Sequence, residues 1–230
     1  MEYRNELKFL CSEQDIQILK ARLEPFMKQD IHQNEADSYQ IRSVYFDDYE
    51  DHGLRENEAG VDLRKKFRIR IYNCSKEMIR LEVKYKIHGK TKKESCQLSL
   101  EEYRAIMEGD IDDIFWKKKS KVFHMFYLAV RTEYLQPKII VEYERSAFVH
   151  EAGNVRITFD RNIASSDDME HFFEKDMLTI PVMETGKHIV EVKYDEFLPD
   201  YILNVMQLPH IQQTAFSKYY WCRKVSHLGV

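Results

Sequence analysis

Basic residues alternate along two neighbouring stretches of the chain, with a spacing that suits phosphate binding. In residues 64–72, every second residue from position 64 to position 70 is Arg or Lys, and residues 67, 69 and 71 are apolar. In residues 80–86, Glu82, Lys84 and Lys86 alternate with Leu, Val and Tyr. Because side chains alternate between the two faces of a β-strand, each run predicts a strand with one charged face and one apolar face. Like charges on adjacent strands repel each other unless an anion lies between them, so the pattern indicates an anionic ligand.

Similar charged motifs recur on other predicted strands. Beside Arg68/Arg70 of the first run, they are Glu6/Lys8, Arg156/Thr158/Asp160 and Glu191/Lys193. If the strands close into a barrel, these polar faces share one lumen and the apolar faces lie under helices. Arg and Lys would donate to phosphate oxygens, and the interspersed glutamates could hold a divalent cation. The alternative is a set of half-buried strands whose polar faces are in water, as in many antiparallel sheets.

Other catalytic and metal-binding motifs are absent from the sequence. It has no Walker A motif, no GxSxG, and no HxH or HExxH among its nine histidines. The acidic run 47–51 could bind a metal, but a solvated loop is the simpler expectation for it. Phosphate binding would therefore depend on the basic strands rather than on a glycine-rich loop.

Composition limits the class of protein further. The chain has 230 residues, 43% of them hydrophobic, and a net charge of −4, which argues against a general nucleic-acid binder. Its four cysteines form no CxxC pair, so we expect reduced thiols rather than a zinc site or a disulfide framework. The charged N-terminus is unlike a signal peptide, and no apolar run is long enough to span a membrane. We expect one cytoplasmic domain over residues 1–230.

The periodicity predicts an α+β fold whose short connections favour antiparallel strands. Capping boxes at Ser12/Asp15 and Ser99/Glu102 predict the starts of two helices, and Gly109 ends the second of them. Expected strands cover residues 4–10, 38–46, 64–72, 80–86, 91–98, 138–148, 155–160 and 189–194. Further helices are expected before Gly60 and over residues 118–133, 199–206 and 211–224. The fold class that we expect is an antiparallel β-barrel with helices packed on its outside.

An ordered set of motifs resembles the VTC domain, the polyphosphate polymerase domain of the vacuolar transporter chaperone complex, which is a triphosphate tunnel metalloenzyme related to the CYTH group. The motifs lie at residues 4–9, 43–47, 66–72, 82–84, 143–148, 156–160, 191–193 and 217–218. The resemblance covers nearly the whole chain. One departure is Arg4-x-Glu6-x-Lys8, where CYTH enzymes tend to have ExExK; this difference favours the VTC branch.

The resemblance implies roles for particular residues. The residues that would act on the transferring phosphate are Arg68, Arg70, Lys84, Arg145 and Lys218. Those that would bind the rest of the substrate are Lys8, Lys66, Lys86, Arg156 and Lys193. Glu191 would hold Mn²⁺ or Mg²⁺, with Glu6 and Glu82 as further metal ligands or, equally, as internal ion-pair partners of the cations.

The activity that the resemblance implies is transfer of the γ-phosphate of ATP to a phosphate or polyphosphate acceptor. A hydrolase that cleaves a triphosphate with the same fold is the alternative, and a cyclase is more distant. A binding module for polyphosphate or nucleotide that performs no catalysis would use the same residues. The sequence leaves the oligomeric state open.

Overall fold

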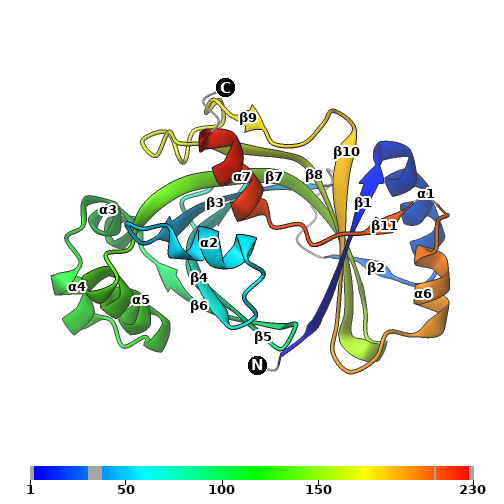
Figure 1. Cartoon of the computed structure of the whole chain (residues 1–230), viewed down its shortest axis with the longest axis horizontal. Helices are drawn as coiled ribbons and strands as arrows, with labels where there is room; N and C mark the ends of the chain where they lie inside the picture. The colour runs from blue at the N-terminus through cyan, green and yellow to red at the C-terminus, as the bar shows by residue number, and fades with distance from the viewer. Residues whose placement is uncertain (1–2, 31–37, 210, 228–230) are drawn as a thin grey trace.

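The computed structural model describes residues 3–30, 38–209 and 211–227. Figure 1 shows a strongly curved sheet with α3, α4 and α5 on one side, α1 and α6 on the opposite side, and α2 and α7 between them. The strands are β1 (Asn5–Ser12), β2 (Lys28–Gln29), β3 (Tyr39–Asp47), β4 (Arg64–Tyr72), β5 (Ile79–Ile87), β6 (Lys90–Leu98), β7 (Gln136–His150), β8 (Val155–Ser166), β9 (Ile180–Pro181), β10 (Lys187–Tyr194) and β11 (Gln212–Gln213). The helices are α1 (Glu13–Leu23), α2 (His52–Glu58), α3 (Leu100–Glu108), α4 (Asp112–Lys117), α5 (Lys121–Thr132), α6 (Asp200–Met206) and α7 (Lys218–His227), with a single 3₁₀ turn at Ala152–Asn154.

The sheet is antiparallel at every strand pair, as predicted, but it is not closed into a barrel. Its order is β11-β1-β10-β8-β7-β3-β4-β5-β6, with β2 added to β7 and β9 added to β8. In the described part of the chain, the only backbone pairing between the β1 side of this path and β6 is an isolated bridge between Arg4 and Thr91. Closure would need a continuous ladder between β1 and β6, so the expectation of a closed barrel is corrected to a curved open sheet.

The apolar faces of the basic strands form a core under the three helices on one side. Ile69 and Ile71 of β4 are fully buried in one cluster with Phe123 and Phe126 of α5. Phe126 also makes edge-on ring contacts with Phe67, at a centroid separation of 5.5 Å. This packing fixes which face of β4 points away from the helices, and that face carries the basic residues. The prediction that Ile69 and Ile71 pack outward under helices is confirmed.

Both predicted capping boxes are present and start the outer helices where expected. Ser12 accepts a hydrogen bond from the Asp15 backbone N–H at the start of α1, and Ser99 accepts one from Glu102 at the start of α3. α1 and α6 cover a second core against β1, β8 and β10. None of the helices in the described ranges is both long and apolar enough to cross a membrane.

The C-terminal segment differs from its prediction. A helix was expected over residues 211–224, but α7 begins only at Lys218. Residues 212 and 213 instead pair with β1, and the Thr214 N–H donates to the Lys8 carbonyl, at 2.9 Å. Backbone pairing with a neighbouring strand therefore overrides the helical periodicity here. Similarly, residues 118–133 are a shorter helix that Ser120 caps, and α4 precedes it without having been predicted.

Candidate functional site

A cavity of about 840 Å³ lies on the face of β4 and β5 that points away from α5. Fourteen Lys or Arg residues and only two carboxylates contribute to its lining. The lining includes all ten of the cations predicted from the sequence: Lys8, Lys66, Arg68, Arg70, Lys84, Lys86, Arg145, Arg156, Lys193 and Lys218. Glu6 and Glu191 are the two carboxylates, whereas Glu82 does not line the cavity. Such an excess of one charge in a concave site focuses a strong positive potential.

The register of β4 and β5 places like charges directly opposite each other. Lys66 pairs with Lys84, and Arg64 pairs with Lys86. Directly opposite side chains lie about 5 Å apart at their Cβ atoms, a distance at which like charges destabilise a sheet. Arg68 is different, because it pairs with Glu82. Arg70 lies opposite Arg80, so like charges face each other at three pairs of this face and the repulsion is relieved only at Arg68.

The effect of this repulsion on pKa is clearest at Lys66. Its side chain is half-buried, and its ammonium lies 2.9 Å from the Asn57 side-chain oxygen, with no carboxylate within salt-bridge distance among the described residues. Burial and then the neighbouring Arg64 and Lys84 lower the pKa of Lys66 to about 7. Burial likewise lowers the pKa of Lys84 to about 8, although Glu6 opposes the shift. An anion bound between these lysines would restore their charge.

Glu82 holds Arg68 in place from beneath the cavity. One Glu82 oxygen accepts from Arg68 Nε and Nη2, at 2.8 and 2.7 Å, and the other accepts from Lys93, at 2.8 Å. Arg68 Nη1 donates to the Tyr45 hydroxyl, at 2.8 Å. Burial alone would raise the pKa of Glu82, but Arg68, Arg70 and Lys93 hold it well below its usual range. This environment favours the ion-pair role for Glu82 over the role of metal ligand.

Asp160 of β8 organises a second cationic group. Its carboxylate accepts from Arg145 Nε and Nη2, at 2.6 and 2.7 Å, and lies 2.5 Å from Lys218 Nζ of α7. Asp160 is fully buried, whereas Arg145 and Lys218 line the cavity. Residues that are far apart in the sequence thus meet through one buried carboxylate.

Tyr143 lies among three of the predicted cations. Its hydroxyl accepts from Arg70 Nη2, at 2.9 Å, and its ring centroid lies 5.2 Å from the Arg145 guanidinium carbon and 4.8 Å from Lys218 Nζ. Burial acts to raise the pKa of Tyr143, but Arg145 and Arg70 outweigh it and lower the pKa. Cation–π contacts of this kind hold cations without neutralising them. Arg145 and Lys218 are also paired with Asp160, so Arg70 is the one of these three whose charge no carboxylate of the described residues pairs with.

The remaining predicted cations are distributed around the rest of the lining. Lys8 Nζ donates to the Phe216 carbonyl, at 2.8 Å, and lies 3.1 Å from Glu6. Arg156 pairs with Asp30, at 2.5 Å. Lys193 pairs with Glu191, at 2.8 Å, and Lys86 lies opposite Arg64 on the neighbouring strand.

Glu6 and Glu191 are the residues that could hold a divalent cation. They are adjacent carboxylates, and each influences the pKa of the other. Burial and Glu191 act to raise the pKa of Glu6, but Lys84, Lys8 and Lys193 together lower it to about 2. The described residues contain no group of three or more metal-binding side chains. Two ionised carboxylates do fit Mg²⁺ or Mn²⁺, because such ions commonly take one or two carboxylates and complete their shell with phosphate oxygens and water.

Several contributors to the site were missed by sequence reasoning. Tyr45 and Tyr143 line the cavity, although tyrosine was assigned to the apolar faces. The alternation of side chains along a strand could have identified them, because Tyr143 is two residues from Arg145 and therefore shares its face. Asp160 belongs to one of the charged motifs of the sequence, but only the folded register reveals which cations it pairs with.

The acidic run 47–51 begins with a buried anchor, Asp47, and continues as a loop in which Tyr49 is 81% exposed. Asp47 is 4% exposed and accepts from the backbone N–H groups of Gly53 and Leu54 and from the Tyr219 hydroxyl. Asp51 pairs with Lys138 and Arg223. The expectation of a solvated loop holds for the middle of the run and is wrong for Asp47, which with Asp51 ties α2 and α7 to the sheet.

Comparisons with known proteins agree with this architecture. The family model described as the VTC domain matches residues 3–227. A search of curated proteins finds no match. A Bacillus halodurans protein, provisionally assigned as an adenylate cyclase, aligns with 84% of this chain and 80% of its own, at 17% identity and a TM-score of 0.51. A protein from Pyrococcus horikoshii aligns with 89% and 84%, at 15% identity and a TM-score of 0.42. At these identities the first structure is evidence of a shared fold alone.

Proposed function

The chain belongs to the VTC domain family, and we propose on that premise that it is an ATP-dependent polyphosphate polymerase. It would transfer the γ-phosphate of ATP to a phosphate or polyphosphate acceptor in the basic cavity. The observation that carries the proposal is the cavity lining, with fourteen cations against two carboxylates. Lys66 supports it further, because it has no carboxylate within salt-bridge distance among the described residues, whereas Lys84 pairs with Glu6, at 2.7 Å. A narrow, densely charged chain of phosphates would match this positive charge.

Phosphoryl transfer requires positioning and charge neutralisation more than covalent help from the protein. Arg68 and Arg70 would donate to oxygens of the transferring phosphoryl group from β4, and Arg145 would donate from β7, which β3 separates from β4 in the sheet. Their positions are fixed in advance by Glu82, Tyr143 and Asp160, so little reorganisation is needed. Lys84 and Lys218 would neutralise charge on adjacent phosphates.

A divalent cation bound by Glu6 and Glu191 would neutralise further charge on the phosphates when present. The chain's own residues hold both carboxylates ionised for that purpose, because neighbouring lysines keep the pKa of Glu6 at about 2 and that of Glu191 well below its usual range. Lys193, 2.8 Å from Glu191, would help to orient that carboxylate. Whether Mn²⁺ or Mg²⁺ is preferred depends on ligand geometry that the substrate itself would complete.

The nature of the acceptor favours transfer over hydrolysis. A phosphate oxygen is already anionic near neutral pH, so its attack needs no general base. None of the histidines that the structure describes lines the cavity. Glu6, with a pKa of about 2, is too weak a base to activate water efficiently. These features support a polymerase more than the alternative triphosphatase.

Product analysis after incubation with ATP and Mn²⁺ tests the proposal. We expect ADP together with chains of phosphate, resolved by gel electrophoresis and phosphorus-31 NMR. Arg145→Ala should abolish both products, whereas Arg104→Ala, which alters an exposed arginine on α3, should leave them unchanged. ADP with free phosphate alone would indicate the triphosphatase, pyrophosphate with cyclic AMP would indicate a cyclase, and tight binding without turnover would indicate a binding module; each of these would overturn the proposal.

A further inference from the structure

Helix α2 borders the basic cavity and places one side chain beside Lys66. Residues 56–58 of this helix are Glu, Asn and Glu, and of the three only Asn57 lines the cavity. The Asn57 side-chain oxygen accepts a hydrogen bond from the Lys66 ammonium, at 2.9 Å. Successive residues of a helix point about 100° apart, so a glutamate on either side does not share the direction of Asn57. The helix therefore presents a neutral side chain to the lysine, although carboxylates flank it in the sequence.

The charged groups that act most strongly on Lys66 come from four strands. Three of them are cations, namely Arg64 on the same strand, Lys84 on β5 and Lys8 on β1. The fourth is Asp47 at the end of β3, whose carboxylate already accepts from two backbone N–H groups of α2 and from a hydroxyl of α7. The surroundings of Lys66 thus repel its charge more than they neutralise it.

Two uncharged groups hold the ammonium in this position. One is the Asn57 amide oxygen, and the other is the ring of Tyr219, whose centroid lies 4.8 Å from Lys66 Nζ. A neutral acceptor and an aromatic face fix a cation without cancelling its charge. The two helices that carry these groups are joined, because the Glu58 carboxylate of α2 lies 3.1 Å from Lys224 of α7. The position of Lys66 is therefore set by α2 and α7 together.

A carboxylate at position 57 would be a stronger partner for a lysine than an amide is. It would also pair with the ammonium and repel a chain of phosphates. We propose that Asn57 is a positioning residue, which fixes the Lys66 ammonium at the cavity and leaves its charge for a bound phosphate. This inference rests on the proposed function, because it takes a phosphate chain as the ligand of the cavity.

Isothermal titration with tripolyphosphate tests the inference, and Asn57→Asp is the decisive variant. It keeps the size of the side chain and supplies the missing carboxylate, so we expect the affinity to fall at least about tenfold. Asn204→Asp is the matched control, because it adds the same charge at an exposed residue of α6, a helix distant from α2 (Figure 1). It should bind tripolyphosphate as the wild type does.

Proton uptake on binding distinguishes positioning of the charge from a general loss of structure. At pH 7, close to the pKa of Lys66, about half of the Lys66 side chains are charged before the ligand binds. A carboxylate at position 57 raises that pKa, so Asn57→Asp should take up fewer protons than the wild type. Asn57→Leu removes the acceptor at similar size and lowers the pKa, so it should take up more. Titration in buffers of different ionisation enthalpy measures both changes.

Thermal unfolding without ligand completes the test. Asn57→Asp gains an ion pair with Lys66, so it should melt at or above the temperature of the wild type although it binds the ligand less tightly. The inference is overturned if Asn57→Asp keeps the wild-type affinity, if the three proteins take up equal numbers of protons, or if weaker binding accompanies a lower melting temperature. The proposed function survives each of these outcomes. A wild type that does not bind tripolyphosphate would overturn both.

Discussion

At the scale of single residues, the protonation of a lysine in the cavity depends on whether an anionic ligand is bound. Lys66 is the clearest case, because it faces Lys84 across the strands and its pKa lies near 7. A buried ammonium without a counter-charge is disfavoured, so deprotonation relieves it. A bound phosphate would supply that counter-charge and return the pKa towards its ordinary value. Ligand binding and proton uptake are therefore coupled at this residue.

Affinity for tripolyphosphate should consequently fall as the pH rises above 7. Below the pKa of about 7, Lys66 is already charged, and binding needs no proton; above it, binding takes up a proton, and the dissociation constant should rise by up to about tenfold per pH unit. Isothermal titration in buffers of different ionisation enthalpy measures the proton uptake directly.

Lys66→Arg is the matched variant for this measurement, because arginine stays charged throughout the range. Its titration should be flatter than that of the wild type in the same buffers, and the ligand's own ionisation cancels in the comparison. Equal proton uptake by the two proteins would show that Lys66 is not the coupled group.

At the scale of elements, α7 is fixed over the cavity by a carboxylate far from it in sequence. Asp47, at the end of β3, accepts from two backbone N–H groups at the start of α2 and from the Tyr219 hydroxyl of α7, at 2.5 Å. The glycine at position 53 permits this approach, since a Cβ there would lie 2.9 Å from the carboxylate. The position of Lys218, the first residue of α7, depends on this anchor.

Tyr219→Phe should therefore destabilise the protein by about 1–3 kcal/mol, because a buried carboxylate loses one of its donors. Urea unfolding measures that loss. Affinity for tripolyphosphate should also weaken, because α7 and with it Lys218 would be held less firmly. Tyr134→Phe, at an exposed tyrosine, is the control and should change neither quantity. An unchanged unfolding free energy in Tyr219→Phe would contradict the anchoring role.

The helices and strands that could be predicted are those whose positions depend on residues close together in the sequence. Alternation in β4 and β5 and the two capping boxes depend on neighbouring residues, and the structure has them where predicted. The prediction of a helix over residues 211–217 was wrong because residues 212 and 213 pair with β1. This contact joins distant segments of the chain, so periodicity cannot reveal it. The cations of the cavity could be identified from strand parity and family resemblance. Their ion-pair partners, such as Asp160 for Lys218, could not be predicted, because they depend on which distant segments meet in the fold.

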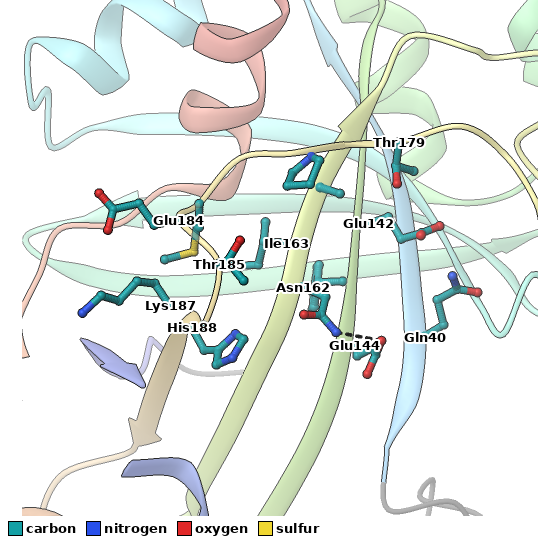
Figure 2. Close-up of a pocket in the computed structure, with 15 residues that line it drawn as sticks. Gln40, Glu142, Glu144, Asn162, Ile163, Thr179, Glu184, Thr185, Lys187 and His188 are labelled. Carbon is teal, nitrogen blue, oxygen red and sulfur yellow. Dashed lines mark hydrogen bonds between the residues drawn. The ribbon is translucent and has the colours of Figure 1, made fainter. Parts of the chain in front are cut away.

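At the scale of the whole molecule, the protein has a net charge of −4 while one cavity concentrates fourteen cations. Only two carboxylates line that cavity, and the others lie elsewhere, as Glu142 and Glu144 of β7 do in a smaller pocket (Figure 2). This separation of charge favours a compact polyanion at one place and disfavours general binding to nucleic acid. The curved sheet keeps the cations on one concave face, with the helices of the two cores behind it.

A polyanion should therefore stabilise the whole fold. At tripolyphosphate concentrations about a hundredfold above the dissociation constant, linkage predicts about 2.7 kcal/mol of added stability. For a protein of this size, that corresponds to a rise in melting temperature on the order of 5–10 °C. Differential scanning calorimetry measures the rise, which should shrink as sodium chloride screens the cavity. A melting temperature that tripolyphosphate leaves unchanged would contradict the proposed ligand.

The most direct test of the account is the affinity of Arg70→Ala for tripolyphosphate, measured by isothermal titration. Arg70 is 4% exposed and lines the cavity. It donates to the Ser43 and Tyr143 hydroxyls and not to a carboxylate, so its removal leaves no hydrogen-bonded carboxylate without its partner. Truncation of a buried cation that faces a bound phosphate costs about 2–5 kcal/mol. The account predicts that binding weakens at least about thirtyfold in Arg70→Ala and stays unchanged in Arg104→Ala. Equal affinity of Arg70→Ala and the wild type would contradict the claim that this cavity binds the triphosphate.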